Sequence, residues 1–147
     1  MGDALAEADR AGEKGEVPVG CILVANDTIV GRGHNLRESS HDPTAHAEMI
    51  AIKEAALARG DWRLDDVTAY VTLEPCAMCA GAFVHARVKR VVYGCDDPKS
   101  GAVKSLFSIG QDPRLNHRFA LESGVRAEEC AAKLRAFFEK LRAQGKK

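Results

Sequence analysis

The feature that most constrains the fold is an alternation of strand-like and helix-like segments along the chain. Residues 67–95 show it most clearly. Residues 67–73 are rich in β-branched side chains, a helical segment follows Pro75 to about Arg87, and residues 90–95 (RVVYGC) form a second apolar run. A strand reached from its predecessor by a short helical crossover usually lies parallel to it. The pattern therefore predicts one layered α/β domain with a partly parallel sheet.

The remaining segments fit the same architecture. We expect further strands at residues 17–25, 28–34 and 119–125, and helices at residues 1–14, 42–59 and 127–143. Asn26-Asp27 is a typical hairpin turn, while Asp42 and Pro43 resemble an N-cap and a first helical residue. An apolar stripe on the last helix favours packing in the core: Cys130, Leu134, Phe137, Phe138 and Leu141. With no repeat or linker, residues 1–147 are expected to form a single domain.

Composition narrows the class of protein without naming a substrate. Apolar residues make up 46% of the chain, which predicts a globular fold, and 21 basic residues balance 21 acidic ones. Any nucleic-acid surface must therefore come from local clusters, such as residues 85–90, 114–118 and 133–147. No apolar run approaches the roughly 20 residues of a membrane span, and the first residues do not resemble a signal peptide. We expect a soluble, cytoplasmic protein with no membrane partner.

Two short motifs carry the chemistry. Cys76 and Cys79 lie three residues apart at an expected helix start, so both sulfurs share one face. The first turn of a helix favours the thiolate, which is the form that binds zinc. A CxxC motif alone also fits a redox dithiol or half of a zinc finger, but no second CxxC is present. An odd number of scattered cysteines is likewise a poor disulfide framework.

His46 in the second motif, His46-Ala47-Glu48, would complete a set of three protein ligands. Zinc prefers four ligands, and three from the protein leave the fourth position for water, as in catalytic sites. Zinc lowers the pKa of a bound water to about 7, and Glu48 would then move the proton to the leaving group. Residues two apart do not share a helix face, so His46 and Glu48 must converge at the N-terminal end of their helix.

The sequence around these motifs resembles the bacterial tRNA adenosine deaminases of the cytidine deaminase superfamily. The resemblance extends over nearly the whole chain, through GEVPVGCILV, HDPTAHAEMIAI, YVTLEPCAMCAGAFVHARVKRVVYGCDDPKSGA, DPRLNHRF and EECAAKL. The spacing H-x-E…P-C-x-x-C is the signature of zinc deaminases. The resemblance implies a three-layer cytidine deaminase-like α/β fold, in which helices flank a five-stranded mixed sheet, and a homodimer.

The resemblance also implies the activity and its residues. It implies hydrolytic deamination of the wobble adenosine of a tRNA anticodon to inosine, with a tRNA anticodon stem-loop as partner. One Zn²⁺ per chain would lie on His46, Cys76 and Cys79, with Glu48 as the catalytic proton shuttle. The substrate contacts implied in the same way are Asn35, Ala47, Asp97, Lys99 and Asn116.

Two other functions fit part of the pattern. A deaminase of a free nucleobase or nucleoside, such as cytosine, guanine or cytidine, would use the same metal chemistry. In a non-catalytic zinc or RNA-binding module, a structural zinc would require a fourth protein ligand. Cys95 and His85 could supply one, but neither has a ligand-like spacing. The discriminating feature between the two deaminase classes is a surface that contacts RNA phosphates.

Overall fold

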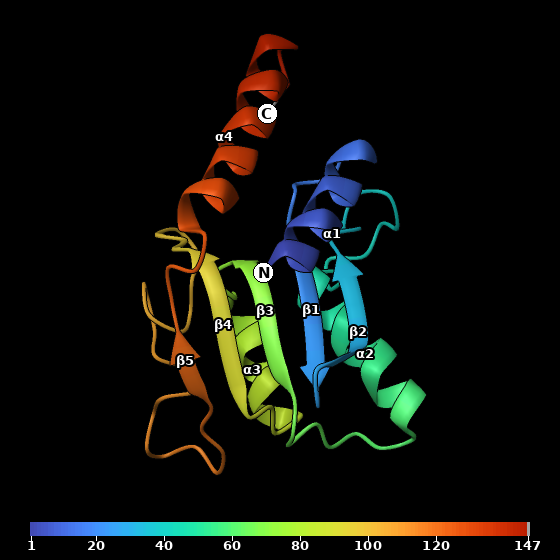
Figure 1. Ribbon diagram of the computed structural model, residues 1–147. Coiled ribbons are helices and arrows are strands. Elements are labelled where there is room, and N and C mark those ends of the chain that lie inside the picture. Colours follow the sequence, from blue (N-terminus) through green and yellow to red (C-terminus); the bar gives the residue numbers. More distant parts are fainter. Residues whose placement is uncertain (147) are drawn as a thin grey trace.

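The computed structural model describes residues 1–146 and contains one five-stranded sheet with the order β2-β1-β3-β4-β5 (Figure 1). The strands are β1 (Gly20–Ala25), β2 (Thr28–His34), β3 (Thr68–Leu73), β4 (Arg90–Cys95) and β5 (Ala120–Glu122). The helices are α1 (Gly2–Glu13), α2 (Ala47–Arg59), α3 (Ala77–His85) and α4 (Ala127–Ala143). Within the described residues, no helix has the length and apolar character that a membrane crossing requires.

The sheet is mixed, as predicted. β1 pairs antiparallel with β2 and β3, while β4 runs parallel to both β3 and β5. The parallel β3–β4 pair confirms the expectation from the short helical crossover, which is α3. Asn26 and Asp27, with φ of 50° and 60°, form the predicted turn between β1 and β2, since such tight hairpins favour positive φ at both positions.

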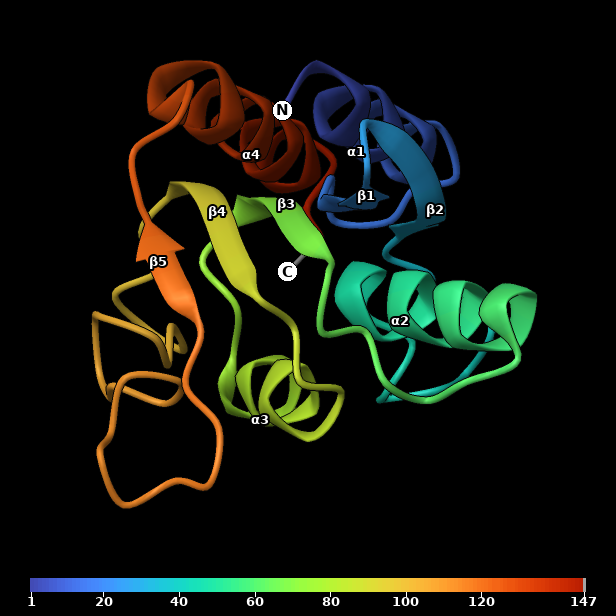
Figure 2. The ribbon, with the colours of Figure 1, turned by 60° about the horizontal axis from the view of Figure 1, so that its bottom comes forward.

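Helices cover both faces of the sheet and give the expected three layers. α1 and α4 lie on one face, and α2 and α3 lie side by side on the other (Figure 2). The central strands are consequently covered on both faces, which explains why β1 (GCILVA) consists only of apolar residues and glycine. The largest fully buried side chains include Tyr93, Phe83 and Leu23.

Several predicted segments have different bounds in the structure. β1 begins at Gly20 rather than at residue 17, and β5 spans only Ala120–Glu122 rather than residues 119–125. α2 begins at Ala47 rather than near Pro43, because the Asp42 carboxylate accepts hydrogen bonds from the backbone and hydroxyl of Thr44, at 2.8 and 2.7 Å, and closes a local turn. The apolar stripe of α4 is only partly in the core. Cys130 is buried, but Phe138 is 40% exposed, because the C-terminal half of α4 projects beyond the sheet (Figure 1).

Glycines in β2 let α2 pack unusually close to the sheet. A Cβ atom on Gly33 would lie 2.2 Å from the Ala47 carbonyl oxygen, and one on Gly31 would lie 2.4 Å from that of Ala51. Both distances are far below van der Waals contact. The absence of side chains at these two positions therefore fixes where the N-terminus of α2 lies.

We predict that Gly33→Ala lowers the free energy of unfolding by about 1–3 kcal/mol, because the added methyl must displace the α2 backbone. Gly12→Ala is the matched control, since its Cβ would meet Pro18 Cβ at 3.9 Å and alanine favours a helix. Urea unfolding of the two variants measures the difference. Equal stability of Gly33→Ala and the parent would contradict the close packing described here.

Candidate active site

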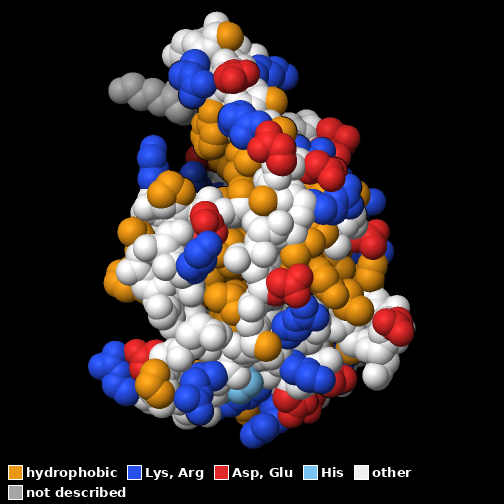
Figure 3. All heavy atoms as spheres, turned by 60° about the vertical axis from the view of Figure 1, so that its left-hand side comes forward, with side chains coloured by type: hydrophobic (Ala, Val, Ile, Leu, Met, Phe, Trp, Pro, Cys, Tyr) orange, Lys and Arg blue, Asp and Glu red, His pale blue; other side chains and the backbone are white. Residues whose placement is uncertain are grey.

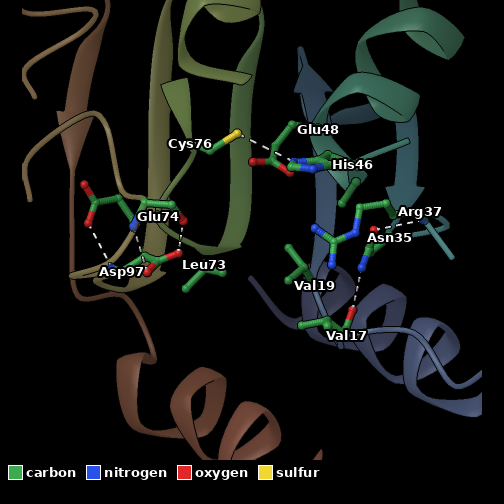
Figure 4. A pocket seen from close by; sticks show the side chains of 12 residues that line it. Val17, Val19, Asn35, Arg37, His46, Glu48, Leu73, Glu74, Cys76 and Asp97 are labelled. Carbon is green, nitrogen blue, oxygen red and sulfur yellow. Dashed lines mark hydrogen bonds between the residues drawn. The ribbon is translucent and has the colours of Figure 1, made fainter. Parts of the chain in front are cut away.

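A pocket of about 160 Å³ opens at the end of the sheet where β3 and β4 finish. Its walls come from the segment before β1, the residues after β2, the starts of α2 and α3, and the loop after β4. Figure 4 shows the side chains around it, with Cys76, Glu74 and Asp97 on one side and Asn35 and Arg37 on the other. The pocket therefore collects residues that are far apart in the sequence.

His46, Cys76 and Cys79 form a metal-ligand group at this pocket. One potential ligand atom from each lies within 4.8 Å of the others. His46 Nδ1 is 3.6 Å from the sulfur of Cys76 and 3.6 Å from that of Cys79. A tetrahedral zinc ion, with bonds of about 2.3 Å to sulfur and about 2.0–2.1 Å to nitrogen, separates such ligand atoms by about 3.6 Å. The three side chains thus fit zinc.

The charges of the two thiols differ before any metal binds. A hydrogen bond from Cys79 and another from His46, opposed by burial, lower the pKa of Cys76 to about 4. The same Cys76 partner, together with burial, raises the pKa of Cys79. The pKa of His46 is raised, chiefly by its hydrogen bond to Cys76. The hydrogen bonds within the trio therefore favour a thiolate at Cys76, and zinc binds both cysteines as thiolates.

His46 and Glu48 converge as the motif requires. His46 is the N-cap of α2 and has an extended backbone, with φ −81° and ψ 152°, so it is not bound by helical spacing. Glu48 lies in the first turn. Because His46 precedes the helix and Glu48 lies in its first turn, both side chains face the same pocket (Figure 4).

Glu48 is placed to transfer protons. It is 4% exposed, and burial is the main cause that raises its pKa to about 7. A carboxyl group with a pKa near neutrality can both accept and return a proton at physiological pH. Its position beside the ligand group gives it access to a water held there.

Asn35 lies at the pocket wall with a fixed side chain. Its Oδ1 accepts a hydrogen bond from Arg37 N at 3.2 Å, and its Nδ2 donates to Val17 O at 3.4 Å. Each amide atom retains one further hydrogen-bonding position for a ligand. Ala47 and Asp97, both expected as substrate contacts, also line the pocket.

The other two expected contacts lie outside this pocket. Lys99 lines a neighbouring groove formed with α4. Asn116 is exposed and precedes β5. Ala120 pairs with Arg90, the first residue of β4, so the segment with Asn116 lies at the opposite end of that strand from Asp97. Any RNA contact of Asn116 is therefore separate from the pocket of the same subunit.

Sequence reasoning missed several pocket residues. They are Val17, Val19, Arg37, Leu73, Glu74 and Ser100. Glu74 and Arg37 have a sequence signal, since each is two residues from an expected site residue, Cys76 and Asn35. The valines and Leu73 are ordinary strand residues in the sequence, and only the sheet register places them here.

The comparisons with known proteins agree with this geometry. The model for the cytidine and deoxycytidylate deaminase zinc-binding region matches residues 1–95. A tRNA-specific adenosine deaminase of Bacillus subtilis (strain 168) is 52% identical over 146 residues, which is 99% of this chain and 91% of that protein. One of Haemophilus influenzae is 49% identical over 97% of this chain and 83% of its own length.

Two solved structures that resemble this chain are also deaminases. A structure from studies of A-to-I editing by tRNA:A34 deaminases at the wobble position of transfer RNA has a TM-score of 0.86 and 44% identity, covering 89% of this chain and 95% of that chain. A guanine deaminase from Nitrosomonas europaea has a TM-score of 0.76 at 21% identity, over 93% of this chain and 81% of that one. The second similarity shows the shared fold alone.

We predict about one zinc per chain in the purified protein, and its loss in Cys76→Ala, because two protein ligands hold zinc far more weakly than three. Cys95→Ala is the matched control, since Cys95 is a free cysteine outside the ligand group. Elemental analysis of folded protein gives the stoichiometry. Zinc retained by Cys76→Ala and lost from Cys95→Ala would contradict the assigned ligands.

Proposed function

Because this chain belongs to the cytidine and deoxycytidylate deaminase family, we propose that it is a zinc-dependent hydrolase that converts adenosine to inosine at the wobble position of a tRNA anticodon. The whole chain acts as one deaminase domain. The observation that carries the proposal is the three-ligand group with buried Glu48 beside it, in a chain that matches tRNA-specific adenosine deaminases over nearly its full length.

The chain's own residues account for the proton movements of the reaction. His46, Cys76 and Cys79 would hold a zinc ion, which would supply Lewis acidity and lower the pKa of water at the site to about 7. Glu48 removes a proton from the attacking water and delivers it to N1 of adenine as the C–O bond forms at C6. The second proton of that oxygen then passes through Glu48 to the amino nitrogen, the C–N bond breaks and ammonia leaves, which gives the C6 carbonyl and the N1–H of inosine.

The pocket walls suit a flat base with polar edges. Val17, Val19 and Leu73 provide apolar surface for the base, while Asn35 and the backbone of Ala47 provide polar groups for its edge. Since the Asn35 amide is already held by Val17 and Arg37, it needs no rearrangement to receive a base. This preorganisation reduces the entropy lost on binding.

RNA would approach along the groove between the loop after β4 and α4. Lys99, Arg135, Phe138 and Arg142 line this groove, and Ser100, the neighbour of Lys99, lines the pocket. The base must leave its stack to enter the pocket, at a cost of a few kcal/mol, and phosphate contacts offset that cost. The ring of Phe138 packs edge-on against that of its neighbour Phe137, with the ring centroids 5.4 Å apart.

The cationic groups near this groove are not equivalent. Figure 3 shows Lys and Arg mixed with Asp and Glu over this side of the molecule rather than in one basic patch. Arg135, which lines the groove, pairs with Glu128, whereas Arg114, in the segment before β5 and outside the groove lining, pairs with Asp112 at 2.7 Å. Lys99 and Arg142 take part in no ion pair among the described residues, which favours them as phosphate contacts.

Free cysteines and the tRNA substrate together support a cytoplasmic location. All five cysteines are free in the structure, as expected where thiols stay reduced. The proposal therefore includes the cytoplasm as the compartment in which the enzyme works.

We predict that Glu48→Ala retains zinc but loses about 10²–10⁴-fold in kcat on an anticodon stem-loop with a wobble adenosine, because no other group relays the proton. Glu54→Ala, on the exposed side of the same helix, is the matched control. Inosine formation is measured beside free adenosine, cytosine and guanine. Turnover of a free base with no inosine in the stem-loop would instead support a small-molecule deaminase.

We predict that the affinity for the same stem-loop falls with salt, with a log–log slope of about −0.7 per phosphate contact. Lys99→Gln and Arg142→Gln should each make the slope shallower by about 0.7, the contribution of one phosphate contact. Arg114→Gln, which removes a paired cation, should leave it unchanged. A salt-independent affinity of the parent protein would exclude phosphate contacts as a source of binding.

We further propose that the active form is a homodimer built on α3 and the end of α2. α3 (AMCAGAFVH) carries no acidic or Lys/Arg side chain, yet Ala77 is exposed, and Met78, Gly81 and Ala82 are only half-buried. A helix that is apolar on all sides is normally buried on all sides. Beyond the end of α3, the Arg87 guanidinium lies 5.8 Å from the centroid of the Trp62 ring, which is 56% exposed, and Leu57 near the end of α2 is 74% exposed. A second copy of this surface would cover it.

We predict that the parent protein sediments as a dimer and that Gly81→Arg sediments as a folded monomer. A Cβ on Gly81 has nothing within 4 Å, so the subunit tolerates the side chain while the interface does not. Ala136→Arg, at an exposed position of α4, should remain dimeric. A monomeric parent, or a dimeric Gly81→Arg, would rule out this interface.

A further inference from the structure

Two buried glutamates, Glu74 in the pocket lining and Glu16 behind it, are not part of the metal group. Glu16 is 1% exposed and Glu74 is 2% exposed. Neither takes part in an ion pair among the residues described. An ionised carboxylate buried in this way needs hydrogen-bond donors for its oxygens, and here loop backbones supply them.

Glu16, between α1 and β1, holds the loop that follows β2. Its Oε1 accepts a hydrogen bond from Glu38 N at 3.1 Å, and its Oε2 accepts one from Ser39 N and one from Ser39 Oγ, both at 2.6 Å. Burial opposes ionisation, but these hydrogen bonds outweigh it and keep the pKa of Glu16 below its usual range. From this loop the Arg37 side chain projects into the pocket (Figure 4).

Glu74, between β3 and α3, holds the loop that follows β4. Its Oε1 accepts a hydrogen bond from Asp97 N at 3.0 Å, and its Oε2 accepts hydrogen bonds from the backbone N–H groups of Val103, Lys104 and Ser105, at 3.3, 3.0 and 2.9 Å. The Ser105 hydroxyl adds another.

Gly101 closes over the same carboxylate. A Cβ at Gly101 would lie 2.4 Å from Glu74 Oε1, so only glycine lets the loop pack this tightly. The loop wrapped around Glu74 carries Asp97 and Ser100 into the pocket lining. The position of this wall therefore depends on one buried side chain.

The two loops form opposite sides of the pocket. Figure 4 places Arg37 and Asn35 on one side and Asp97 with Glu74 on the other. The metal ligands and Glu48, by contrast, are set by the starts of α2 and α3. The residues of the chemical step are thus positioned by helix starts, whereas the walls of the pocket opening are positioned by the two loops.

We propose that Glu16 and Glu74 are positioning residues that fix the two walls of the pocket opening and so determine how the nucleotides beside the reactive base are held. This inference rests on the proposed function, because a free base would have no flanking nucleotides. Neither glutamate touches the reacting atoms. Each acts through its loop, Glu16 through Arg37 and Glu74 through Asp97.

Replacement by glutamine tests the proposal at constant size. A carboxylate is acceptor-only, whereas an amide turns an NH₂ donor toward backbone N–H groups and releases the loop. Glu16→Gln and Glu74→Gln should each raise KM for the stem-loop about tenfold, change kcat by less than about threefold, and retain zinc. Ser39→Ala and Ser105→Ala, which remove one hydrogen bond each, should raise KM in the same direction by a smaller factor.

Leu64→Ala is the control for general destabilisation. Leu64 is fully buried, and its N–H bonds to Ala86 O beyond the end of α3, away from both loops. If Leu64→Ala lowers the Tm as much as the glutamate variants do, it should still leave the KM for the stem-loop unchanged. If KM rises equally in Leu64→Ala, or if Glu16→Gln and Ser39→Ala leave KM unchanged, the glutamates have only a structural role and the proposal is wrong.

A double-mutant cycle tests the route through the loop. Glu16→Gln combined with Arg37→Ala should have the KM of Arg37→Ala alone, since the loop has then already lost the group it positions. Fully additive effects would contradict this route. Measurements on the parent protein distinguish the two proposals. If the parent forms no inosine in the stem-loop, the proposed function is wrong. If the parent forms inosine but the glutamate variants have an unchanged KM, only the proposed role of Glu16 and Glu74 is wrong.

Discussion

The metal group depends on two helices that begin close enough for side chains at their N-termini to meet, with His46 Nδ1 3.6 Å from the sulfurs of Cys76 and Cys79. His46 caps α2 and Cys76 caps α3, and neither helix is fixed there by its own sequence. α2 is held by close packing on Gly31 and Gly33 of β2, and α3 by its short connection from β3. Helix N-termini also favour negative charge, which suits the thiolates that zinc requires. Packing of glycine against the helix backbone, at Ala47 between His46 and Glu48, thus sets the ligand geometry.

The surroundings of the metal group divide into a rigid and an adjustable part. Helix starts in the core hold the three ligands and Glu48, so the chemistry that they support is common to any substrate with a suitable amino group. The pocket opening is made instead by two loops, each wrapped around a buried carboxylate, and by the groove along α4. Differences among deaminases in what they accept can therefore arise at loops without disturbing the zinc ligands.

Much of this could be predicted from the sequence, for physical reasons that also explain the failures. The β3–α3–β4 unit follows from the order of its apolar segments, and the ligands follow from residue type and spacing. The start of α2 was misplaced because Asp42 uses its carboxylate in a local turn. The apolar stripe of α4 suggested a buried helix, but half of it extends past the sheet. Asn116 illustrates a further limit: a family resemblance gives a role to a residue, but only the strand pairing shows that it lies at the other end of β4.

X-ray absorption at the zinc edge of the purified protein distinguishes a catalytic zinc site from a structural one, since it counts the ligand atoms around the metal. We expect two sulfur ligands at about 2.3 Å and two nitrogen or oxygen ligands at about 2.0–2.1 Å, only one of them an imidazole. That result leaves one position for water beside Glu48. A spectrum with a third sulfur or a second imidazole would mean a closed, structural zinc site and would contradict the catalytic account.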